Sequence, residues 1–416
     1  MSLFCSHTVL PEALECWPVS MLEWLLPRHM KIIYDINHMF LRYVDLKWPG
    51  DVSKARSLSI IRENPKNVRM GHLAIIGSHC INGVARIHTD LLKTTVFPDF
   101  YELWPEKFQN KTNGVTPRRW VFEANPFLSH LITNTLAVGH EWVVDTRLLS
   151  GLESFCENKL FQFRWMEAKR KAKERLATFI QSKSGVRLNT TAIFDIQAKR
   201  IHEYKRQLLN CLGVIWRWLK IRETPPERRS SIVPRVVIIG GKAAPGYKVA
   251  KLILKLFNRV AAVVNADQDV ADLLKVVIVP NYGVSLAELL IPASDLSEHI
   301  STAGTEASGT SNMKFGMNGG LIIGTMDGAN VEIAEEIGAE NMFIFGATAQ
   351  EVPGIRASRE KRPMSPDLAA VIGEIRKGTF GPPDMYSPIL HSLTDEDYYL
   401  VAYDFGSCKR KLFFHS

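Results

Sequence analysis

The amino-acid sequence predicts an α/β protein whose C-terminal part is built on a parallel sheet with helices on both faces. Beyond residue 191, short apolar runs alternate with longer helical patterns. Near-continuous apolar strands are typical of parallel sheets, because both faces of such strands are buried. Polar segments follow these runs. Since ligands of open parallel sheets bind beyond the carboxyl ends of the strands, we expect a ligand site in these polar segments.

Length and composition indicate an ordinary globular protein. The chain has 416 residues and a formal net charge of +8, a length that corresponds to roughly two or three domains. No block of Lys and Arg is interleaved with aromatic residues, so nucleic-acid binding is not expected. The densest basic run, Lys169–Arg175, is expected to form a solvated helix face, with attraction of an anionic ligand as the alternative.

The cysteines and the N-terminus bear on the compartment. The six cysteines lack CxxC spacing, which argues against a zinc site and a disulfide framework and fits a reducing compartment. The chain does not open with the basic and apolar regions of a secretory signal, and no uncharged apolar run reaches transmembrane length. We therefore expect a cytoplasmic protein with no metal and no membrane contact.

The first part of the chain is predicted to be mainly helical. Residues 11–48 show apolar positions three or four residues apart, and Pro27 is expected to separate two helices or to kink one. A short strand is expected at Leu73–Ile76, followed by a turn and by a helical pattern that resumes near Asn82. A domain boundary is predicted within residues 97–120, which are rich in aromatic residues, proline and turn signals. Further helices are expected from about 126 to 182.

Strands and helices are predicted to alternate in the C-terminal part. The expected strands are Thr191–Ile196, Val236–Gly241, Val276–Val279 and Leu321–Thr325. The expected helices are Glu203–Arg222, Tyr247–Val264 and one near Pro366–Lys377, within loops from about 348 to 385. The polar segments at the strand ends are Gln197–Lys205, Gly240–Gly246, Asn281–Val284 and Thr325–Glu332. Their convergence at the ends of strands favours a ligand site at that edge.

The first candidate element of this site is a cluster of cations at residues 199–206. Four cations, a histidine and a tyrosine occupy this strand-to-helix junction. If the helix begins near Ile201, Lys199 and Arg200 lie in the preceding turn and Lys205 lies one turn further along. Cations in the first turn of a helix oppose its dipole, so the pattern favours a phosphate site over a solvated helix start.

The second candidate element is a loop of small residues. Ser301–Gly304 and Ser308–Ser311 lie either side of Glu306, and Lys314 follows three residues after the second run. Glycines and small hydroxyl residues before a helix leave backbone N–H groups accessible to an anion. A lysine one turn further on supplies a charge or a covalent amine. The alternative is a surface loop with a solvated lysine.

Several long motifs resemble those of the α-1,4-glucan (glycogen/starch) phosphorylases. The motifs are H-T-V-L-P-E-A-L-E from His7, N-K-T-N-G-V-T-P-R-R-W from Asn110, K-R-I-H-E-Y-K-R-Q-L-L-N from Lys199, E-A-S-G-T-S-N-M-K-F from Glu306 and G-T-M-D-G-A-N-V-E-I from Gly324. They occur in the family's order, and the resemblance extends from about His7 to Phe405.

The resemblance implies a glycosyltransferase type B fold, in which two Rossmann-like domains face a cleft. Residues 1–112 would be the C-terminal part of an incomplete N-terminal domain, 113–405 the pyridoxal-phosphate-binding domain, and 406–416 an atypical tail. The implied activity transfers a terminal glucosyl unit from an α-1,4-glucan to inorganic phosphate, giving glucose 1-phosphate with retention. The family is allosteric, and its complete members are expected to be homodimers.

The resemblance also assigns residues to the phosphates. Lys314 matches the lysine that holds pyridoxal 5′-phosphate as a Schiff base, and the cofactor's phosphate relays a proton to the substrate phosphate. Arg200 and Lys205 match the clamp on the substrate phosphate. Contacts with the cofactor phosphate are implied for Lys199, Gly309 and Thr310. The implied catalytic residues are Lys199, Arg200, Lys205, His7 and Thr310.

Sugar contacts are implied in the same way. A single histidine in a polar turn is more often structural, but His7 matches a glucose-contacting histidine whose main-chain carbonyl helps to stabilise the oxocarbenium-like state. Groups that hold sugar hydroxyls are implied at Asn113, Glu306, Ser308 and Gly309, and residues lining the cleft at Tyr204 and Tyr282.

The sequence departs from the family pattern at several places. Ser6 stands where asparagine is usual, and Gly283 where animal enzymes commonly carry arginine. The resemblance begins late in the family's N-terminal domain and omits its glycine-rich loop, its regulatory segment and its last helices. A non-catalytic fragment that binds glucan or pairs with a full-length subunit is therefore an alternative. A sugar-nucleotide glycosyltransferase without the cofactor is a further one, although it has no need of Lys314.

Overall fold

The structure is a computed structural model that describes residues 2–358 and 364–413. The described chain divides into two compact units. Unit 1 contains the residues up to Asn113 together with Gly304–Ser308 and Asp327–Glu332, and unit 2 contains the remainder. Two short segments from late in the chain therefore belong to the N-terminal unit. The expected domain limits at 112, 405 and 416 remain predictions.

Within the described residues, unit 2 is built on a six-stranded sheet in the order β12-β11-β10-β7-β8-β9. Its strands are β7 (Ile193–Ala198), β8 (Arg235–Gly240), β9 (Leu274–Val279), β10 (Leu296–His299), β11 (Leu321–Gly324) and β12 (Phe343–Ile344). Neighbouring strands run parallel throughout this order. The predicted α/β class with a parallel sheet is thus confirmed, and each predicted strand of this part lies within about two residues of an observed one.

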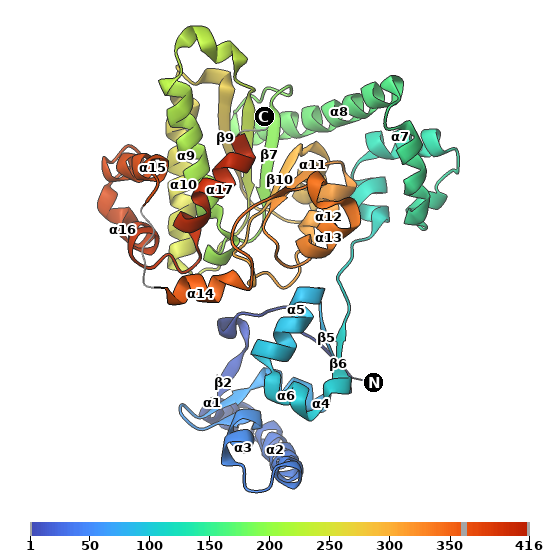
Figure 1. Ribbon diagram of the computed structural model, residues 1–416, viewed down its shortest axis with the longest axis vertical. Coiled ribbons are helices and arrows are strands. Elements are labelled where there is room, and N and C mark those ends of the chain that lie inside the picture. The colour runs from blue at the N-terminus through green and yellow to red at the C-terminus, as the bar shows by residue number, and fades with distance from the viewer. Residues whose placement is uncertain (1, 359–363, 414–416) are drawn as a thin grey trace. The chain divides into compact units, whose positions relative to one another are not determined.

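Helices cover both faces of this sheet, which explains why its central strands are apolar throughout (Figure 1). One face packs against α9 (Gln207–Glu223), α10 (Lys248–Ala266) and α17 (Val401–Phe413), and α15 (Pro366–Arg376) packs on α9. The other face packs against α8 (Lys159–Ser184), α11 (Val284–Ala293) and α12 (Ser311–Met317). Unit 2 also contains α7 (Pro126–Leu136), α14 (Glu351–Ala357) and α16 (Ser387–His391), while α13 (Asn330–Ile337) begins in unit 1.

Unit 1 contains two small sheets. A parallel sheet has the order β1-β5-β6, formed by Leu3–Cys5, Cys80–Gly83 and Phe108–Asn110. An antiparallel sheet has the order β2-β4-β3, formed by Cys16–Pro18, Asn67–Arg69 and Ile61–Arg62. The helices of this unit are α1 (Val19–Leu25), α2 (Pro27–Lys47), α3 (Val52–Leu58), α4 (Met70–Gly77), α5 (Arg86–Leu91) and α6 (Pro98–Leu103). Pro27 separates α1 from α2, as predicted, because proline is tolerated in a first helical turn.

Two predictions for unit 1 are wrong at neighbouring positions. Leu73–Ile76, expected as a strand, lies inside helix α4, and Asn82, expected in a helix, lies in strand β5. A short apolar run does not distinguish a buried helix from a buried strand. Asn82 is in a strand because β5 pairs with β1 on one side and with β6 on the other, and both partner strands are distant in sequence. The expected helix over residues 11–48 is also interrupted, since Cys16–Pro18 pairs with β4.

The helix expected to start near Ile201 begins only at Gln207. Glu203–Lys205 form a 3₁₀ turn, and Arg206 then adopts a left-handed backbone with φ of 56° before α9 begins. Lys205 therefore lies at the end of a 3₁₀ turn before α9 rather than one turn inside a helix. In the segment 348–385, the helix at 366–376 is confirmed, and α14 is an additional helix.

The expectation of a solvated basic face on α8 is wrong for two lysines. Lys169 and Lys173 are only 8% and 7% exposed. The ammonium of Lys169 donates to the carbonyl oxygens of Pro292, Ser294 and Asn318 at 3.0, 2.7 and 2.9 Å. Lys173 donates to a carbonyl oxygen of the loop before β7. Both lysines donate to buried backbone oxygens, and Lys173 also forms an ion pair with Asp295.

We predict that Lys169→Met lowers the free energy of unfolding by about 3 kcal/mol, because buried carbonyl oxygens lose their donor. Urea denaturation measures this change, and Lys171→Met, on the exposed side of α8, is the matched control. Burial lowers the pKa of Lys169 to about 8, against 10.5 for a free side chain. Between these values the unfolded chain binds more protons, so Lys169 makes stability rise with pH, and the variant lacks this rise. Equal stability of the two variants would contradict a stabilising role for the hydrogen bonds of Lys169.

Candidate functional site

The candidate site lies where the order of the strands reverses. Strands β8 and β9 are added to one side of β7, and β10, β11 and β12 to the other. The loops that follow β7 and β10 therefore leave neighbouring parallel strands at the same edge of the sheet. These loops are the cation cluster at 199–206 and the small-residue loop that begins at Ile300. The two predicted anion-binding elements are thus neighbours.

The turn that carries Lys199 is held against the end of β8. The Lys199 N–H donates to the Gly240 carbonyl at 2.8 Å, and the Ile201 N–H donates to the Lys242 carbonyl at 3.1 Å. A Cβ atom on Gly241 would lie 2.1 Å from the Lys199 carbonyl oxygen, so only glycine permits this approach. Lys199 is half-buried in the turn, whereas Arg200 is exposed.

The backbone around Lys205 is held by a side chain on β7 and by the loop after β10. The Gln197 side chain, on β7, donates to the Lys205 carbonyl at 3.3 Å. The N–H of Thr302, after β10, donates to the Tyr204 carbonyl at 3.1 Å. The half-buried Lys205 ammonium lies 4.6 Å from the centre of the Tyr204 ring. Position 205 is therefore set by two strands rather than by a helix.

His299, the last residue of β10, lies beside the two lysines. It is 3% exposed, its Nε2 lies 3.0 Å from the Ser297 hydroxyl, and its ring centre is 5.9 Å from that of Phe315 on α12. Burial, together with the charges of Lys199 and Lys205, lowers the pKa of His299 well below its ordinary value. The imidazole is therefore neutral and adds no positive charge to this edge of the sheet.

Lys314 projects from α12 next to an aromatic ring. Its ammonium lies 4.1 Å from the centre of the Trp120 ring, and burial lowers its pKa. A lowered pKa increases the fraction of neutral amine, which is the nucleophilic form. The Asn318 side chain donates to the carbonyls of Trp120 and Lys314 at 2.7 and 2.9 Å and accepts from Asn125 at 3.0 Å. Together with the Lys169 ammonium, this asparagine fixes α12 against the body of unit 2.

Gly309 and Thr310 lead directly into α12. Gly309 has a φ of 75°, a conformation that favours glycine, and Thr310 is the residue before the first helical one. Both are half-buried. The Lys314 N–H donates to the Thr310 carbonyl at 3.3 Å. The backbone that carries the predicted cradle and the predicted amine is thus one continuous turn.

Glu306 and Ser308 belong to unit 1, where Asp327 organises their loop. Asp327 is 2% exposed, and its carboxylate accepts from the N–H groups of Gly304 and Glu306, each at 2.9 Å. The Ala329 N–H donates to the Ser308 carbonyl at 2.7 Å. The segments 304–308 and 327–332 are therefore held together by a buried carboxylate and a short backbone bond.

His7 and Asn113 lie in the same unit around Val84 and His88. The fully buried His88 ring lies between the Val84 N–H, at 3.0 Å, and the Thr8 carbonyl, also at 3.0 Å. The Asn113 N–H donates to the Val84 carbonyl at 3.0 Å. His7 is exposed, and Asn113 is half-buried. Burial lowers the pKa of His88, which keeps its ring neutral between donor and acceptor.

The predicted site residues therefore divide between the units. Unit 2 holds Lys199, Arg200, Tyr204, Lys205, Tyr282, Gly309, Thr310 and Lys314. Unit 1 holds His7, Asn113, Glu306 and Ser308. The division falls at the peptide bond between Ser308 and Gly309, in the middle of the small-residue loop. The predicted phosphate contacts lie on one side of it and most of the predicted sugar contacts on the other.

Comparison with known proteins identifies the family. The family model for carbohydrate phosphorylases matches residues 1–411. This chain belongs to the carbohydrate phosphorylase family. The family assignment predicted from the sequence motifs is thus confirmed.

Curated relatives of this chain come from several kingdoms. The chain is 57% identical over 408 residues to glycogen phosphorylase 2 of Dictyostelium discoideum. It is 51% identical over 414 residues to the cytosolic α-glucan phosphorylase 2 of Arabidopsis thaliana, and 49% identical over 409 residues to the muscle glycogen phosphorylase of Oryctolagus cuniculus. Each alignment covers 97% of this chain but only 40%, 49% and 48% of the relative, respectively. The chain thus spans about half the length of these relatives.

Sequence reasoning missed three residues that hold the loops of the candidate site or lie beside its lysines. His299 carries no motif of its own, and the sequence predicts no strand at Leu296–His299, which forms β10. Asp327 lies in a segment that looks like an ordinary capped helix start. His88 closes an apolar stretch without a catalytic pattern. Each acts on backbone groups or charges that are far away in sequence.

The donor set of unit 2 fits a phosphorylated aldehyde cofactor such as pyridoxal 5′-phosphate. Lys314 offers an amine of lowered pKa beside an indole ring, and the charges of Lys199 and Lys205 both act on the neighbouring His299. Among the described residues, no cluster of three or more His, Cys, Asp or Glu side chains is placed to hold a metal ion. No helix in the described part of the chain combines the length and hydropathy that a membrane crossing requires.

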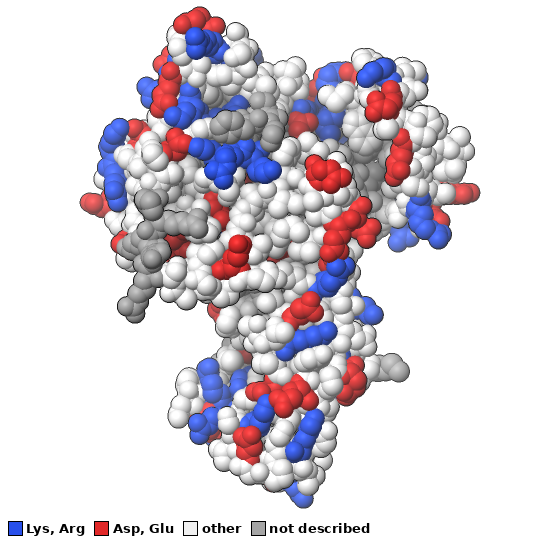
Figure 2. Space-filling view, viewed as in Figure 1, with Lys and Arg blue, Asp and Glu red and all other residues white. Residues whose placement is uncertain are grey.

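Two surface features lie away from this edge. Acidic and basic side chains are interspersed on the face that Figure 2 presents. A cavity of about 320 Å³ is lined by Ile193, Leu296 and Leu321, the first residues of their strands, and by Lys173 and Asp295. It therefore lies at the opposite edge of the sheet from the loops after β7 and β10. Lys173 and Asp295 form an ion pair with a distance of 2.5 Å between the ammonium nitrogen and a carboxylate oxygen.

We predict that Asp327→Ala lowers the free energy of unfolding by about 3 kcal/mol, because buried N–H groups of the Glu306 loop lose their acceptor. Asp327→Asn, which keeps one acceptor oxygen, is expected to lose about half as much. Urea denaturation and amide exchange of residues 304–308 measure the effect, with the exposed Asp35→Ala in the same unit as control. Unchanged exchange of this loop in Asp327→Ala would refute the role of the carboxylate.

Proposed function

We propose that this chain carries the phosphate-handling half of an α-1,4-glucan phosphorylase. The proposed reaction transfers a terminal glucosyl unit of glycogen, starch or maltodextrin to inorganic phosphate and yields glucose 1-phosphate. The observation that carries the proposal is the adjacency of the loops after β7 and β10, which place Lys199 and Lys205 beside His299 and α12. The names of the relatives, which are glycogen and α-glucan phosphorylases, agree with it.

In this proposal, the cations of unit 2 hold two phosphate groups. Lys199 and the backbone amides of Gly309 and Thr310 would bind the phosphate of pyridoxal 5′-phosphate, and Arg200 and Lys205 the substrate phosphate. Lys314 would hold the cofactor covalently (its lowered pKa favours the required neutral amine). When bound, the cofactor supplies a phosphate group that donates and accepts a proton. Two close phosphates repel one another, so fixed positive charges are needed to hold them together.

The proposed sugar contacts come mainly from the other unit. His7 would present its main-chain carbonyl to the positive charge that develops on the glucosyl ring, since a carbonyl dipole stabilises such charge. Hydroxyl groups of the glucose would be held by Asn113, Glu306, Ser308 and Gly309, with Tyr204 and Tyr282 lining the cleft. The carboxylate of Asp327 supports the loop that carries Glu306 and Ser308.

The finer description of the fold is part of the same proposal. The sheet of unit 2 would be the Rossmann-like domain at 113–405 of a glycosyltransferase type B enzyme, and residues 1–112 the C-terminal part of its partner domain. Residues 406–413, assigned to an atypical tail, continue helix α17 in the structure, and 414–416 lie outside the described residues. The complete enzyme would be a cytoplasmic homodimer.

An alternative proposal is a non-catalytic fragment that binds glucan or pairs with a full-length subunit. It is supported by exposed apolar side chains on α1 and α2. Trp24, Met39 and Leu46 are 81%, 72% and 82% exposed, which is typical of a surface that another polypeptide covers. A sugar-nucleotide transferase gains no support, because it has no use for an amine such as that of Lys314.

We predict that borohydride reduction of the purified chain, after incubation with pyridoxal 5′-phosphate, attaches the cofactor to Lys314. Peptide mapping by mass spectrometry locates the label, and absorbance near the Schiff-base band reports it before reduction. Lys314→Ala should carry no label, because the nucleophilic amine is gone. A wild-type chain that binds no cofactor would refute the catalytic proposal.

We predict that Lys205→Ala lowers the rate of glucose 1-phosphate formation by about a hundredfold or more, because a cation that stabilises the transferred phosphate is lost. Cofactor attachment at Lys314 should persist in this variant. Lys251→Ala, exposed on α10, is the matched control and should keep full activity. Cofactor loss in Lys205→Ala would contradict the assignment, because Lys205 would then hold the cofactor phosphate rather than the substrate phosphate. Attachment without activity in the wild-type chain would favour the non-catalytic fragment.

A further inference from the structure

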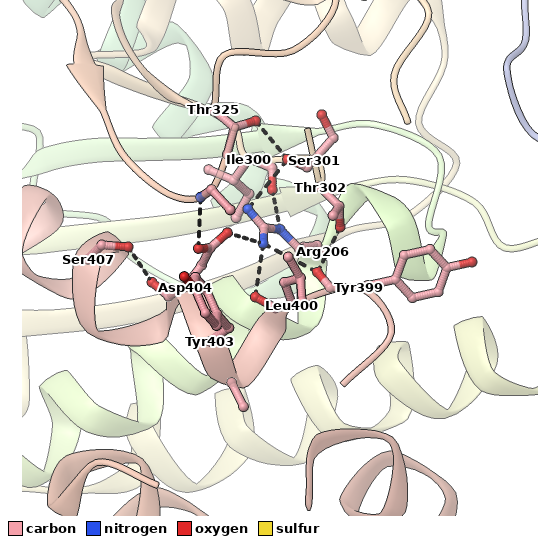
Figure 3. A network of polar contacts seen from close by, with 12 residues as sticks. Arg206, Ile300, Ser301, Thr302, Thr325, Tyr399, Leu400, Tyr403, Asp404 and Ser407 are labelled. Carbon is pink, nitrogen blue, oxygen red and sulfur yellow. Dashed lines mark hydrogen bonds and ion pairs between the residues drawn. The ribbon is translucent and has the colours of Figure 1, made fainter. Parts of the chain in front are cut away.

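Arg206, the residue after Lys205, is buried at the centre of a polar network (Figure 3). Its side chain is 0% exposed. The Nε group donates to the Ile300 carbonyl at 2.6 Å, and Nη2 donates to the Ser301 carbonyl at 3.4 Å. Nη1 donates to the Leu400 carbonyl at 3.1 Å and to a carboxylate oxygen of Asp404 at 2.6 Å. One guanidinium thus joins the loop after β10 to the start of α17.

The partners of Arg206 are themselves fixed. The second carboxylate oxygen of Asp404 accepts from the Ala347 N–H at 3.1 Å, and Asp404 is 2% exposed. The Thr325 hydroxyl donates to the Ser301 carbonyl at 2.7 Å, and the Thr302 hydroxyl donates to the Tyr399 carbonyl, also at 2.7 Å. The network therefore spans the ends of β10 and β11, the turn before α9 and the N-terminal part of α17 (Figure 3).

The same network acts on the backbone of Lys205. Arg206 has a φ of 56°, which is strained for a residue with a side chain and persists only where surrounding contacts impose it. This conformation turns the chain from the 3₁₀ turn of Lys205 into α9. The Thr302 N–H holds the Tyr204 carbonyl at 3.1 Å on the other side of Lys205. Lys205 is thus attached on both sides to the loop that leads to Gly309.

We propose that Arg206 is a positioning residue for the phosphate site, and that its ion pair with Asp404 makes helix α17 part of that site. The guanidinium fixes the loop at 300–302 against the turn of Lys205, and so it sets the distance between Lys205 and the Gly309–Thr310 backbone. Displacement of α17 would therefore change phosphate binding without touching a phosphate contact. This inference rests on the phosphate role proposed above for Lys205.

The chemistry of the side chains suggests two mild variants. Arg206→Lys keeps the charge, but a single ammonium has no planar fork and cannot reach the loop and α17 at once. Asp404→Asn keeps the shape and leaves the guanidinium without its counter-charge. A matched control is the second buried pair of unit 2, Arg235 and Asp195, whose atoms lie 2.8 Å apart with side chains 2% and 3% exposed. Arg235 lies on β8 and Asp195 on β7, so this ion pair does not join the loop at 300–302 to α17.

The experiment uses the whole chain and two readouts. The first is amide hydrogen exchange of residues 300–311 in wild type, Arg206→Lys, Asp404→Asn and Arg235→Lys. The second is the concentration of inorganic phosphate that protects Lys205 from an amine-reactive reagent, read by mass spectrometry. We expect both Arg206→Lys and Asp404→Asn to speed exchange of 300–311 by roughly tenfold and to require roughly tenfold more phosphate. Arg235→Lys should change neither, even where its unfolding midpoint falls equally.

The outcomes separate this inference from the proposed function. Equal exchange of 300–311 in the Arg206 and Arg235 variants would overturn the positioning role, because the effect would then be general destabilisation. Should Arg206→Lys fail to fold, Asp404→Asn decides, since it retains the guanidinium and its carbonyl contacts. Absence of phosphate protection at Lys205 in wild type would overturn the phosphate role proposed for that lysine, while the exchange comparison would still decide whether Arg206 sets the loop.

Discussion

The reversal of strand order at β7 is the constraint on which the site depends. Because β8 and β10 lie on opposite sides of β7, the loops after β7 and β10 leave adjacent strands at one edge. Neither loop forms a regular helix at its start, and each is shaped by the other. The Thr302 N–H satisfies the Tyr204 carbonyl, and the Arg206 guanidinium satisfies two carbonyls of the loop after β10. The positions of the cations therefore follow from backbone contacts between two segments that are about a hundred residues apart in sequence.

Buried charges fasten helices to this sheet. Lys169 and Lys173 join α8 to the loops before β7 and around β10, and Arg206 with Asp404 joins α17 to the other face. Each of these charges has hydrogen-bond partners, because a buried charge without them costs more than its burial gains. Removing one member of such a contact would leave a buried charge or carbonyl oxygen without its hydrogen-bond partner. We therefore expect the positions of α8 and α17 to depend on these contacts. Two lysines of the basic run at 169–175 thus bind backbone oxygens inside the protein rather than solvent.

The division of the chain into two units gives the small-residue loop a double role. Residues 304–308 belong with unit 1, where Asp327 holds them, and residues from Gly309 onward belong with unit 2, where they enter α12. In the proposed reaction, the first part serves the sugar and the second serves the phosphates. The first residue of the second part, Gly309, has a φ of 75°, a backbone conformation that favours glycine.

The sequence alone determined the fold class, four of the six described strands of unit 2 and the two segments proposed to bind anions, whereas it does not predict β10 or β12. Apolar runs and the chemistry of clustered cations are local properties, so they can be recognised without the fold. Only the tertiary structure decided that Leu73–Ile76 is helical, that the chain breaks at Arg206 and that Lys169 is buried. It also revealed His299 and Asp327 as organisers of the site. The physical reason is the same in each case: the deciding partner is a backbone or charged group that lies far away in the sequence and is brought close only by the sheet.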